Sequence, residues 1–273
     1  MPELPEVETV KETLKKKILK QKIVDIKILY PEIIEYPDIE TFKKEIINQT
    51  INDIKRRGKW LIFELDNYYL LSHLRMEGKY NIKTNESINK HEHVIFYFEN
   101  FNLRYQDTRK FGKMYLYKKT EAFENKPLNS LGYEPWDDKL DSSYLKEKYK
   151  KIKKSIKEVL LDQTIIVGIG NIYADEILFL SQINPYKISN KLNDNELNNI
   201  IKNTRYVFEE AIKKGGTTIR TYTSSEGIHG KFQHDLLVHN QKYCKKCNSK
   251  IEIVKIGGRS TYYCPNCQKE CQK

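Results

Sequence analysis

The sequence predicts an α+β protein of more than one domain. We expect an antiparallel β-sandwich or barrel with flanking helices, then a helical part, then a small zinc-binding hairpin. Three observations predict this. Short runs rich in Ile, Tyr and Phe fill residues 23–118, mostly spaced too tightly for crossover helices. Segments with helical periodicity follow, and two Cys-x2-Cys pairs lie near the C-terminus.

Length and charge narrow the class of protein. A chain of 273 residues is typical of two domains with a small appendage. It has 48 Lys and Arg against 37 Asp and Glu, so the formal charge is 48 − 37 = +11. Such a surface attracts polyanions, with nucleic acid first among them, although a coding preference for lysine is the alternative. The start is acidic and no apolar run is long enough to cross a bilayer, so we expect a cytoplasmic protein without membrane contact.

The first part begins with a helix and continues as strands. Pro5 suits the first turn of a helix, and the apolar periodicity continues to about Lys20. Its apolar positions are Val7, Val10, Leu14 and Ile18. Strands are predicted over Ile23–Tyr30, Lys59–Leu65, Tyr68–Leu74, His93–Phe98, Phe101–Tyr105 and Lys113–Lys118.

The pattern changes over 127–141, where turn residues replace periodicity. We therefore assign 1–130 to the sandwich, 131–235 to a helical domain and 236–273 to a cysteine-bearing tail. Helices are expected over Ser142–Leu161, Asn171–Ser181 and Asp194–Lys213, and Gly215–Gly216 ends the last of them. The lysine-dense part of the first helix is more typical of a solvated face than of a binding groove, which is the alternative. The tail is predicted to form two short strands holding the cysteines.

The cysteine spacing predicts a structural zinc site. The ligands would be Cys244 and Cys247, then, after 16 residues, Cys264 and Cys267. Two tight turns closing a hairpin would complete a tetrahedron of thiolates and leave no open position for chemistry. A redox Cys-x-x-Cys is the alternative, and Cys271 is the spare thiol. Arg259 lies at the predicted hairpin turn, where it either contacts phosphate or only solubilises the turn.

A glycine-rich segment over 164–174 allows two interpretations. It resembles a strand followed by G-x-G-x-x-G, but Tyr173 replaces the third glycine and no βαβ unit surrounds it. The alternative is a turn that opens a helix at Asn171 and directs backbone amides at a phosphate. Helix, turn and second helix would then clamp a DNA backbone.

The N-terminal residues are candidates for a catalytic role. Removal of Met1 would expose Pro2 as a secondary amine, whose pKa is near ~8 if it resembles other α-amino groups. Such an amine can attack a sugar carbon and form a Schiff base. Glu3 beside it can supply or remove protons.

The start PELPEVETV resembles that of the bacterial formamidopyrimidine-DNA glycosylases, which excise oxidised purines. Further motifs of that family follow in order along almost the whole chain. They are Arg56–Lys59, His73–Gly78, Asp107–Gly112, Val167–Ala174, Gly215–Thr218 and the four-cysteine segment ending in CPNCQK. The resemblance implies a β-sandwich flanked by helices, then a helix–two-turn–helix DNA-binding domain with a lesion-capping loop at 217–230, then a β-hairpin zinc finger.

The resemblance also implies an activity, that of a DNA glycosylase and abasic-site lyase. It would act as a monomer on double-stranded DNA containing an oxidised purine or an abasic site. Pro2 would attack the anomeric carbon, Glu3 would assist opening of the sugar, and Glu6 would help to set the water and proton network. The imine would then drive β- and δ-elimination, with Lys59 gripping phosphate in the same site.

The implied DNA contacts come from several elements. Asn171 and Arg259 match residues that grip phosphates around the lesion, and His73 and Lys157 match further contacts. Met76, Arg109 and Phe111 match the triad that fills the void left by the extruded base, with arginine facing the orphaned cytosine. Without the family, Met76 and Phe111 would be interpreted as ordinary core.

The loop at 217–230 is implied to close over the extruded base and to read it mainly through backbone groups. The implied base-recognition residues are Glu77, Thr217, Ile219, Arg220, Thr221 and Tyr222. A backbone carbonyl can accept the N7 proton that oxidised guanine carries and normal guanine lacks. Two departures concern this surface: His239 stands in a segment where many relatives have Val-Tyr-Gly, and Arg220 where some have Lys.

Three other functions are weighed against this one. An endonuclease VIII-like glycosylase for oxidised pyrimidines usually begins PEGPE and lacks the Met…Arg-x-Phe triad. A non-catalytic DNA-binding module would need only the zinc finger and the charge, and the presence of Pro2, Glu3 and Lys59 argues against it. A nucleotide-dependent oxidoreductase would need the βαβ unit that the glycine segment lacks.

Overall fold

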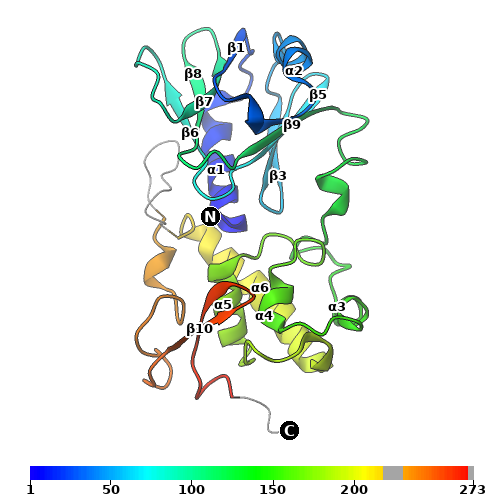
Figure 1. Cartoon of the computed structure of the whole chain (residues 1–273), viewed down its shortest axis with the longest axis vertical. Helices are drawn as coiled ribbons and strands as arrows, with labels where there is room; N and C mark the ends of the chain where they lie inside the picture. Colours follow the sequence, from blue (N-terminus) through cyan, green and yellow to red (C-terminus); the bar gives the residue numbers. More distant parts are fainter. Residues whose placement is uncertain (218–229, 270–273) are drawn as a thin grey trace. The chain divides into compact units, whose positions relative to one another are not determined.

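The computed structural model of the chain describes residues 1–217 and 230–269, which belong to two compact units (Figure 1). The first unit comprises Met1–Ser130 together with Thr217 and Gly230. The second comprises Leu131–Gly216 and the described residues from Lys231 onward.

The first unit is the predicted β-sandwich. Its helices are α1 (Leu4–Ile18) and α2 (Ile39–Ile46). Its strands are β1 (Asp25–Ile28), β2 (Ile34–Tyr36), β3 (Asp53–Arg57), β4 (Trp60–Glu64), β5 (Tyr68–His73), β6 (Lys79–Lys83), β7 (Glu92–Tyr97), β8 (Asn102–Gln106) and β9 (Lys113–Lys118). They form sheets of order β1-β7-β8-β6 and β2-β9-β5-β4-β3, whose buried residues share one hydrophobic core. The antiparallel prediction is confirmed except at one edge, where β2 pairs with β9 in parallel.

Helix α1 closes one side of this core. Its buried positions include the four apolar residues that the periodicity predicted, Val7, Val10, Leu14 and Ile18. The helix ends at Ile18, two residues before the predicted end, because Leu19 adopts an extended conformation. It packs against β3 and β4 and thereby fixes the N-terminus at the edge of the sandwich.

The elements that the sequence did not predict in this unit are α2, β2, β3 and β6. Each is short or faces solvent, so its apolar signal is weak. In β3 only Ile54 is buried, and in β6 only Tyr80. Helix α2 has eight residues, and Asp38 caps its start, because the Asp38 side chain accepts a hydrogen bond from the Thr41 amide at 3.0 Å.

The second unit is built on helices. They are α3 (Ser142–Tyr149), α4 (Ile156–Leu160), α5 (Asn171–Leu180) and α6 (Asp194–Lys213). Helix α6 has the predicted bounds, and Gly215 and Gly216 follow it with positive φ angles of 72° and 78°. It packs against α5 and α3, and α5 packs against α4.

The prediction of one helix over 142–161 is wrong. The segment breaks into α3 and α4 because Ser155 starts a new helix in a capping box. The Ser155 hydroxyl accepts from the Glu158 amide at 3.3 Å, and a Glu158 carboxylate oxygen accepts from the Ser155 amide, also at 3.3 Å.

The tail forms the hairpin of β10 (Glu252–Ile256) and β11 (Arg259–Tyr263), with Gly257 and Gly258 at its turn. The sequence suggested that these strands hold the cysteines, but the structure places the cysteines outside them. One pair precedes β10 and the other follows β11, so the ligand turns lie on either side of the hairpin.

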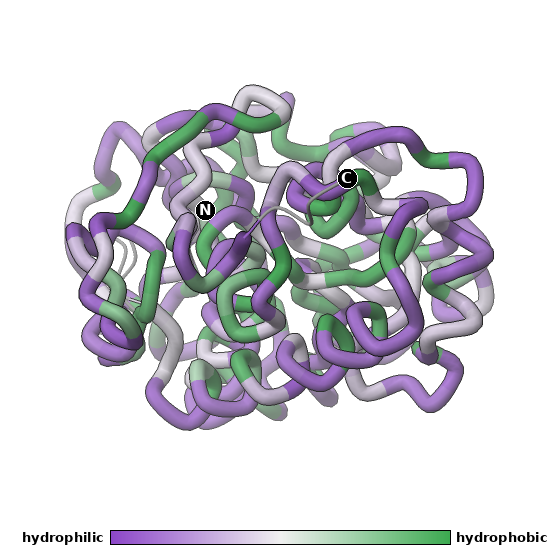
Figure 2. Tube along the Cα trace, turned by 90° about the horizontal axis from the view of Figure 1, so that it is seen from below, coloured by the Kyte–Doolittle hydropathy of each residue, from purple (hydrophilic) through white to green (hydrophobic). Residues whose placement is uncertain are grey.

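Hydropathy changes every few residues along the trace (Figure 2). Among the helices that the structure describes, none has the length and apolar character needed to cross a membrane.

Candidate functional site

The N-terminus of α1 gathers the predicted catalytic carboxylates. Glu3 is 2% exposed and Glu6 is fully buried. One Glu6 carboxylate oxygen, Oε2, accepts the Glu3 amide at 2.9 Å. The other, Oε1, accepts the amide and hydroxyl of Thr217 at 2.8 and 3.0 Å. The structure therefore brings together the start of α1 and the first residue of the predicted base-recognition loop.

Lys59 lies at the turn between β3 and β4, and it is 5% exposed. Gly58 in this turn has a φ of 56°, a conformation that favours glycine. Arg56 ties the turn to α1 because its guanidinium donates to the Gly58 carbonyl at 3.0 Å and to Glu8 Oε2 at 2.7 Å. The turn thus holds Lys59 at a fixed place on the sandwich.

The pKa of the Met1 α-amino group depends on these neighbouring side chains. Burial lowers the pKa of the Met1 α-amino group, and the Lys59 charge acts in the same direction, while the carboxylates of Glu3, Glu6 and Glu77 oppose both. The charges of these predicted site residues therefore act on the terminal amine. A terminal amine with a lowered pKa is more often neutral, as a nucleophile must be, and the carboxylates beside it can move protons.

His73 ends β5 and is held neutral. Its Nδ1 accepts the Arg75 amide at 2.9 Å, which leaves the ring proton on Nε2. Burial holds the pKa of His73 well below its usual value, and the charges of Arg75 and Lys59 add to this. Any phosphate contact of His73 would thus be a neutral hydrogen bond from Nε2. Half-buried Met76 and Glu77 follow in the turn after β5.

Arg109 and Phe111 are exposed in the loop between β8 and β9, and the Phe111 side chain is 47% exposed. The guanidinium carbon of Arg109 lies 4.8 Å from the centroid of the Phe111 ring. The pair therefore forms one protruding cationic and aromatic feature on the sandwich.

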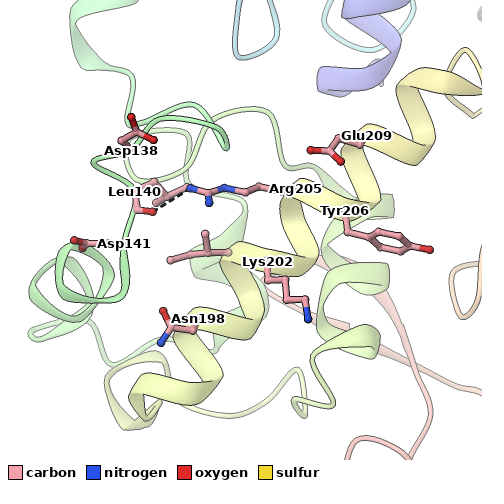
Figure 3. A pocket seen from close by; sticks show the side chains of 9 residues that line it. Asp138, Leu140, Asp141, Asn198, Lys202, Arg205, Tyr206 and Glu209 are labelled. Carbon is pink, nitrogen blue, oxygen red and sulfur yellow. Dashed lines mark hydrogen bonds between the residues drawn. The ribbon is translucent and has the colours of Figure 1, made fainter.

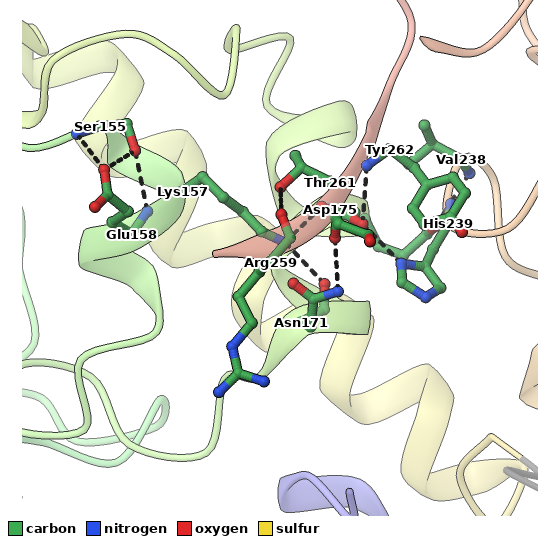
Figure 4. Close-up of polar contacts among 12 residues, drawn as sticks. Ser155, Lys157, Glu158, Asn171, Asp175, Val238, His239, Arg259, Thr261 and Tyr262 are labelled. Atoms are coloured by element: carbon green, nitrogen blue, oxygen red, sulfur yellow. Dashed lines mark hydrogen bonds and ion pairs between the residues drawn. The ribbon is translucent and has the colours of Figure 1, made fainter. Parts of the chain in front are cut away.

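A second group of predicted residues lies within the helical unit (Figure 4). The Asn171 amide Nδ2, at the first turn of α5, donates to the Ser260 carbonyl at 2.8 Å. Ser260 follows the exposed Arg259 at the start of β11. The structure thus joins the N-terminus of α5 to the strand that carries Arg259.

Lys157 is placed differently from what its lysine-rich surroundings suggested. Its side chain is fully buried, with Nζ 2.5 Å from Asp175 Oδ1 and 2.9 Å from the Asn171 carbonyl. This burial corrects the expectation of a solvated face at this lysine and argues against direct contact of its ammonium with DNA. Lys157 holds the first turn of α5 from inside.

Sequence reasoning missed Asp175 and Glu176. Asp175 Oδ2 lies 2.7 Å from Nδ1 of His239 and accepts the Tyr262 amide at 3.2 Å (Figure 4). Glu176 accepts the amides of residues 237–239 at 2.7–3.0 Å, and burial raises its pKa. The available signal was two adjacent acids inside the apolar helix NIYADEILFL. Together they tie α5 to the hairpin and to the segment that carries His239.

The four cysteines form the expected cluster. All four sulfur atoms lie within 4.8 Å of one another, with Cys244 3.8 Å from Cys267 and Cys247 3.4 Å from Cys264. A tetrahedral ion with Zn–S bonds of about 2.3 Å separates its sulfurs by about 3.8 Å. The donor set and spacing therefore fit one zinc ion, and four protein ligands make the site structural.

Some predicted residues lie outside the part of the chain that the structure describes. They are Ile219, Arg220, Thr221, Tyr222 and Cys271.

A hollow of about 500 Å³ opens beside α6 (Figure 3). It is lined by Asp138, Asn198, Lys202, Tyr206 and others, and none of the predicted site residues lines it. Arg205, which also lines the hollow, donates from its guanidinium to the Pro135 carbonyl at 2.7 Å.

The glycine segment before α5 is not a dinucleotide site. Ile166 makes only an isolated bridge with Tyr133, and β10–β11 is the sheet of this unit in the described part of the chain. Gln163 shapes the segment by accepting the Gly168 amide and donating to the Ile169 carbonyl, each at 2.9 Å. The oxidoreductase alternative therefore has no support.

Three family models match the chain. A formamidopyrimidine-DNA glycosylase N-terminal domain matches residues 1–114, a formamidopyrimidine-DNA glycosylase H2TH domain matches 131–223, and a zinc finger found in FPG and IleRS matches 242–269. Fold and cysteine cluster thus define a DNA glycosylase of the helix–two-turn–helix, zinc-finger class.

Individual relatives narrow this class. Formamidopyrimidine-DNA glycosylase of Oceanobacillus iheyensis is 47% identical over 100% of this chain and 99% of its own, and that of Bacillus anthracis is 46% identical over 98% and 99%. A Lactococcus lactis FPG variant bound to Fapy-dG containing DNA superposes with a TM-score of 0.93 at 40% identity, and the L. lactis protein with abasic DNA with 0.92 at 41%. Both structures cover 98% of this chain and 100% of their own. The chain belongs to the formamidopyrimidine-DNA glycosylase family.

Proposed function

We propose that the protein removes oxidised purines, 8-oxoguanine and formamidopyrimidines, from duplex DNA and then cleaves the strand at the abasic site. The observation that carries the proposal is the group at the start of α1. There Glu3, Glu6 and Lys59 are buried near a half-buried terminal amino group whose pKa is lowered by burial. The bound DNAs of the L. lactis structures, Fapy-dG and abasic, support the choice of substrate.

The proposed reaction uses Pro2 as the nucleophile. With Met1 removed, the Pro2 nitrogen attacks C1′, the damaged base leaves with a proton, and the sugar ring opens to an iminium ion. Loss of the C2′ proton then breaks the bond between C3′ and its phosphate oxygen. Loss of the C4′ proton next breaks the bond between C5′ and its phosphate oxygen, and each phosphate leaves with the bonding electron pair. Glu3 protonates the ring oxygen as the sugar opens. Glu6 has both oxygens engaged by backbone and hydroxyl groups, so we assign it to positioning and to the proton network.

The proposed DNA contacts fall into two sets. On the sandwich, Lys59 and neutral His73 contact phosphates, while Met76, Arg109 and Phe111 enter the duplex where the base has left. On the helical unit, Asn171 and Arg259 contact phosphates, and Lys157 positions Asn171 from within. Glu77 and the segment from Thr217 read the extruded base.

The zinc finger has a supporting role in this proposal. Bound zinc would hold the turns at both ends of the hairpin and so fix the strand that presents Arg259. We place the enzyme in the cytoplasm as a monomer. Residues 1–130 carry the chemistry, 131–235 bind DNA and cap the lesion, and 236–273 form the finger.

Glu3→Gln should preserve lesion binding and reduce base excision by about 10²–10⁴-fold, because the amide cannot donate an acidic proton. Single-turnover excision from an 8-oxoguanine duplex measures the rate, and fluorescence anisotropy measures binding. Glu12→Gln is the matched control, since Glu12 lies on the same helix with a 55% exposed side chain. Excision by Glu3→Gln at the wild-type rate would remove Glu3 from the chemistry.

Lys59→Ala and Arg259→Ala should each lower the slope of log Kd against log salt by about 1, the share of one phosphate contact. Titrations of a lesion duplex at several salt concentrations measure the slopes. Lys146→Ala is the control, because Lys146 is exposed on α3 and pairs with Asp194. Unchanged slopes for both test variants would place these side chains away from phosphate.

A further inference from the structure

One buried carboxylate organises the loop between β8 and β9. Asp107 is fully buried, and its Oδ1 accepts the Arg109 amide at 3.0 Å. Its Oδ2 accepts the amides of Phe111 and Gly112, both at 2.9 Å. The Asp107 carbonyl accepts a hydrogen bond from Nε2 of His93 at 2.7 Å. A charged acceptor shared by three backbone donors is a strong anchor, so the loop is shaped from inside.

Tyr105 joins this anchor to the turn after β5. Its buried hydroxyl donates to Asp107 Oδ2 at 3.3 Å. A glycine from each segment lies against that hydroxyl: a Cβ on Gly78 would lie 2.3 Å from it, and a Cβ on Gly112 only 1.7 Å. Both segments therefore need glycine to reach the same tyrosine.

Half-buried Met76 and the exposed Arg109 and Phe111 belong to these two anchored segments. Met76 lies in the turn that closes when the Gly78 amide donates to the Leu74 carbonyl at 2.9 Å. Arg109 and Phe111 lie in the loop held by Asp107. The three side chains that the proposed function directs into the duplex thus share one buried support, although they come from separate parts of the sequence.

We propose that Asp107 and Tyr105 are positioning residues that hold Met76, Arg109 and Phe111 in the geometry that enters DNA. This inference rests on the proposed function only for the entry of these side chains into the duplex. Separating stacked bases requires a feature that resists displacement, because the stack pushes back on whatever enters it. A loop anchored by a charged, buried acceptor meets that need, whereas a loop anchored only by its ends would yield.

Asp107→Asn tests the support with little change in volume, because an amide nitrogen cannot accept the backbone donors that one carboxylate oxygen receives. Asp66→Asn is the matched control: Asp66 accepts the Thr50 amide at 2.7 Å on a different loop of the same unit. Tyr105→Phe is the second variant, which keeps the ring and removes the hydroxyl.

Two measurements distinguish a loss of side-chain positioning from a general loss of folding or catalysis. A duplex with 2-aminopurine beside the base opposite the lesion reports entry of side chains as a fluorescence rise. Cleavage of single-stranded DNA with a preformed abasic site reports the chemistry without any need to open a duplex. We expect Asp107→Asn to slow the fluorescence rise and lesion excision at least about tenfold, equivalent to about 1.4 kcal/mol. Single-strand cleavage should stay within about twofold of wild type.

Tyr105→Phe should shift the same measurements in the same direction by a smaller factor, and Asp66→Asn should leave all of them unchanged. Wild-type fluorescence kinetics in both Asp107→Asn and Tyr105→Phe would overturn the inference. So would an equal loss on duplex and single-stranded substrates, which marks a merely structural role. Absence of excision by the wild-type protein would count against the proposed chemistry alone, because the fluorescence rise does not depend on bond cleavage.

Discussion

Acetylation of the N-terminal amine should abolish strand cleavage and borohydride trapping together while leaving lesion binding largely intact. An amide nitrogen has a delocalised lone pair and cannot attack a sugar carbon. Loss of a nucleophile of this kind costs at least about 10³-fold in rate. Retention of Met1 has the same effect on Pro2, since it places the Pro2 nitrogen in a peptide bond and moves the free amine away by one residue.

Incubation with an 8-oxoguanine duplex and borohydride, followed by peptide mapping, gives the measurement. The reduced imine should appear as a stable protein–DNA crosslink on the N-terminal peptide of the processed protein. Intact mass must first show whether Met1 is present. Pro2→Gly is a weak control because it keeps an α-amine, so acetylated protein is the better comparison.

Two results would contradict the Pro2 mechanism in different ways. A crosslink that maps to Lys59 would make the protein a lyase with a different nucleophile. Cleavage without any trapped species would leave a glycosylase that uses water directly. Lys157 is an unsuitable nucleophile because its ammonium is buried against Asp175.

Cys244→Ser and Cys264→Ser should each lose the bound zinc and, with it, at least about tenfold in DNA affinity. Both thiols are buried, and they pack in one cluster with Phe179 of α5, Val238 and Ile251. Binding of a structural zinc ion is worth about 10–16 kcal/mol in small fingers, so loss of a ligand undoes the local fold. The β11 strand would then no longer present Arg259.

Elemental analysis and anisotropy titration with a lesion duplex measure the two effects on the same preparations. Cys271→Ser is the control, and it should change neither zinc content nor affinity. Full activity in protein stripped of zinc would show that the finger does not depend on the metal.

Local patterns in the sequence were enough to predict the longer elements of this fold, but not the short ones or the break before α4. Helix α6 carries a continuous apolar stripe with a capping residue before it and two glycines after it, so its bounds were predicted to the residue. Strand β3 has one buried side chain, and no periodicity can reveal such a strand. The break before α4 depends on the Ser155–Glu158 capping box, which the surrounding lysines conceal.

The residues of the candidate site were predicted mainly from the family resemblance and less from local sequence patterns. Local patterns are insufficient because the site depends on contacts between residues that are far apart in the sequence. Lys157 lies in the segment KIKKSIK, which is typical of a solvated face, yet Asp175 on the next helix draws it into the interior. Asp107 and Tyr105 likewise become important only when their contacts with Gly78 and Gly112 are known. Burial and pairing of this kind depend on tertiary structure, which a single sequence does not display.

The carboxylate of Glu6 has a further consequence for the arrangement of the site. One oxygen receives the Glu3 amide and the other receives Thr217, so a single group joins two segments with different proposed tasks. Any change at Thr217 that displaces this carboxylate would therefore also alter its contact with the Glu3 amide. The converse holds as well, because a displacement that begins at Glu3 would reach Thr217 through the same carboxylate.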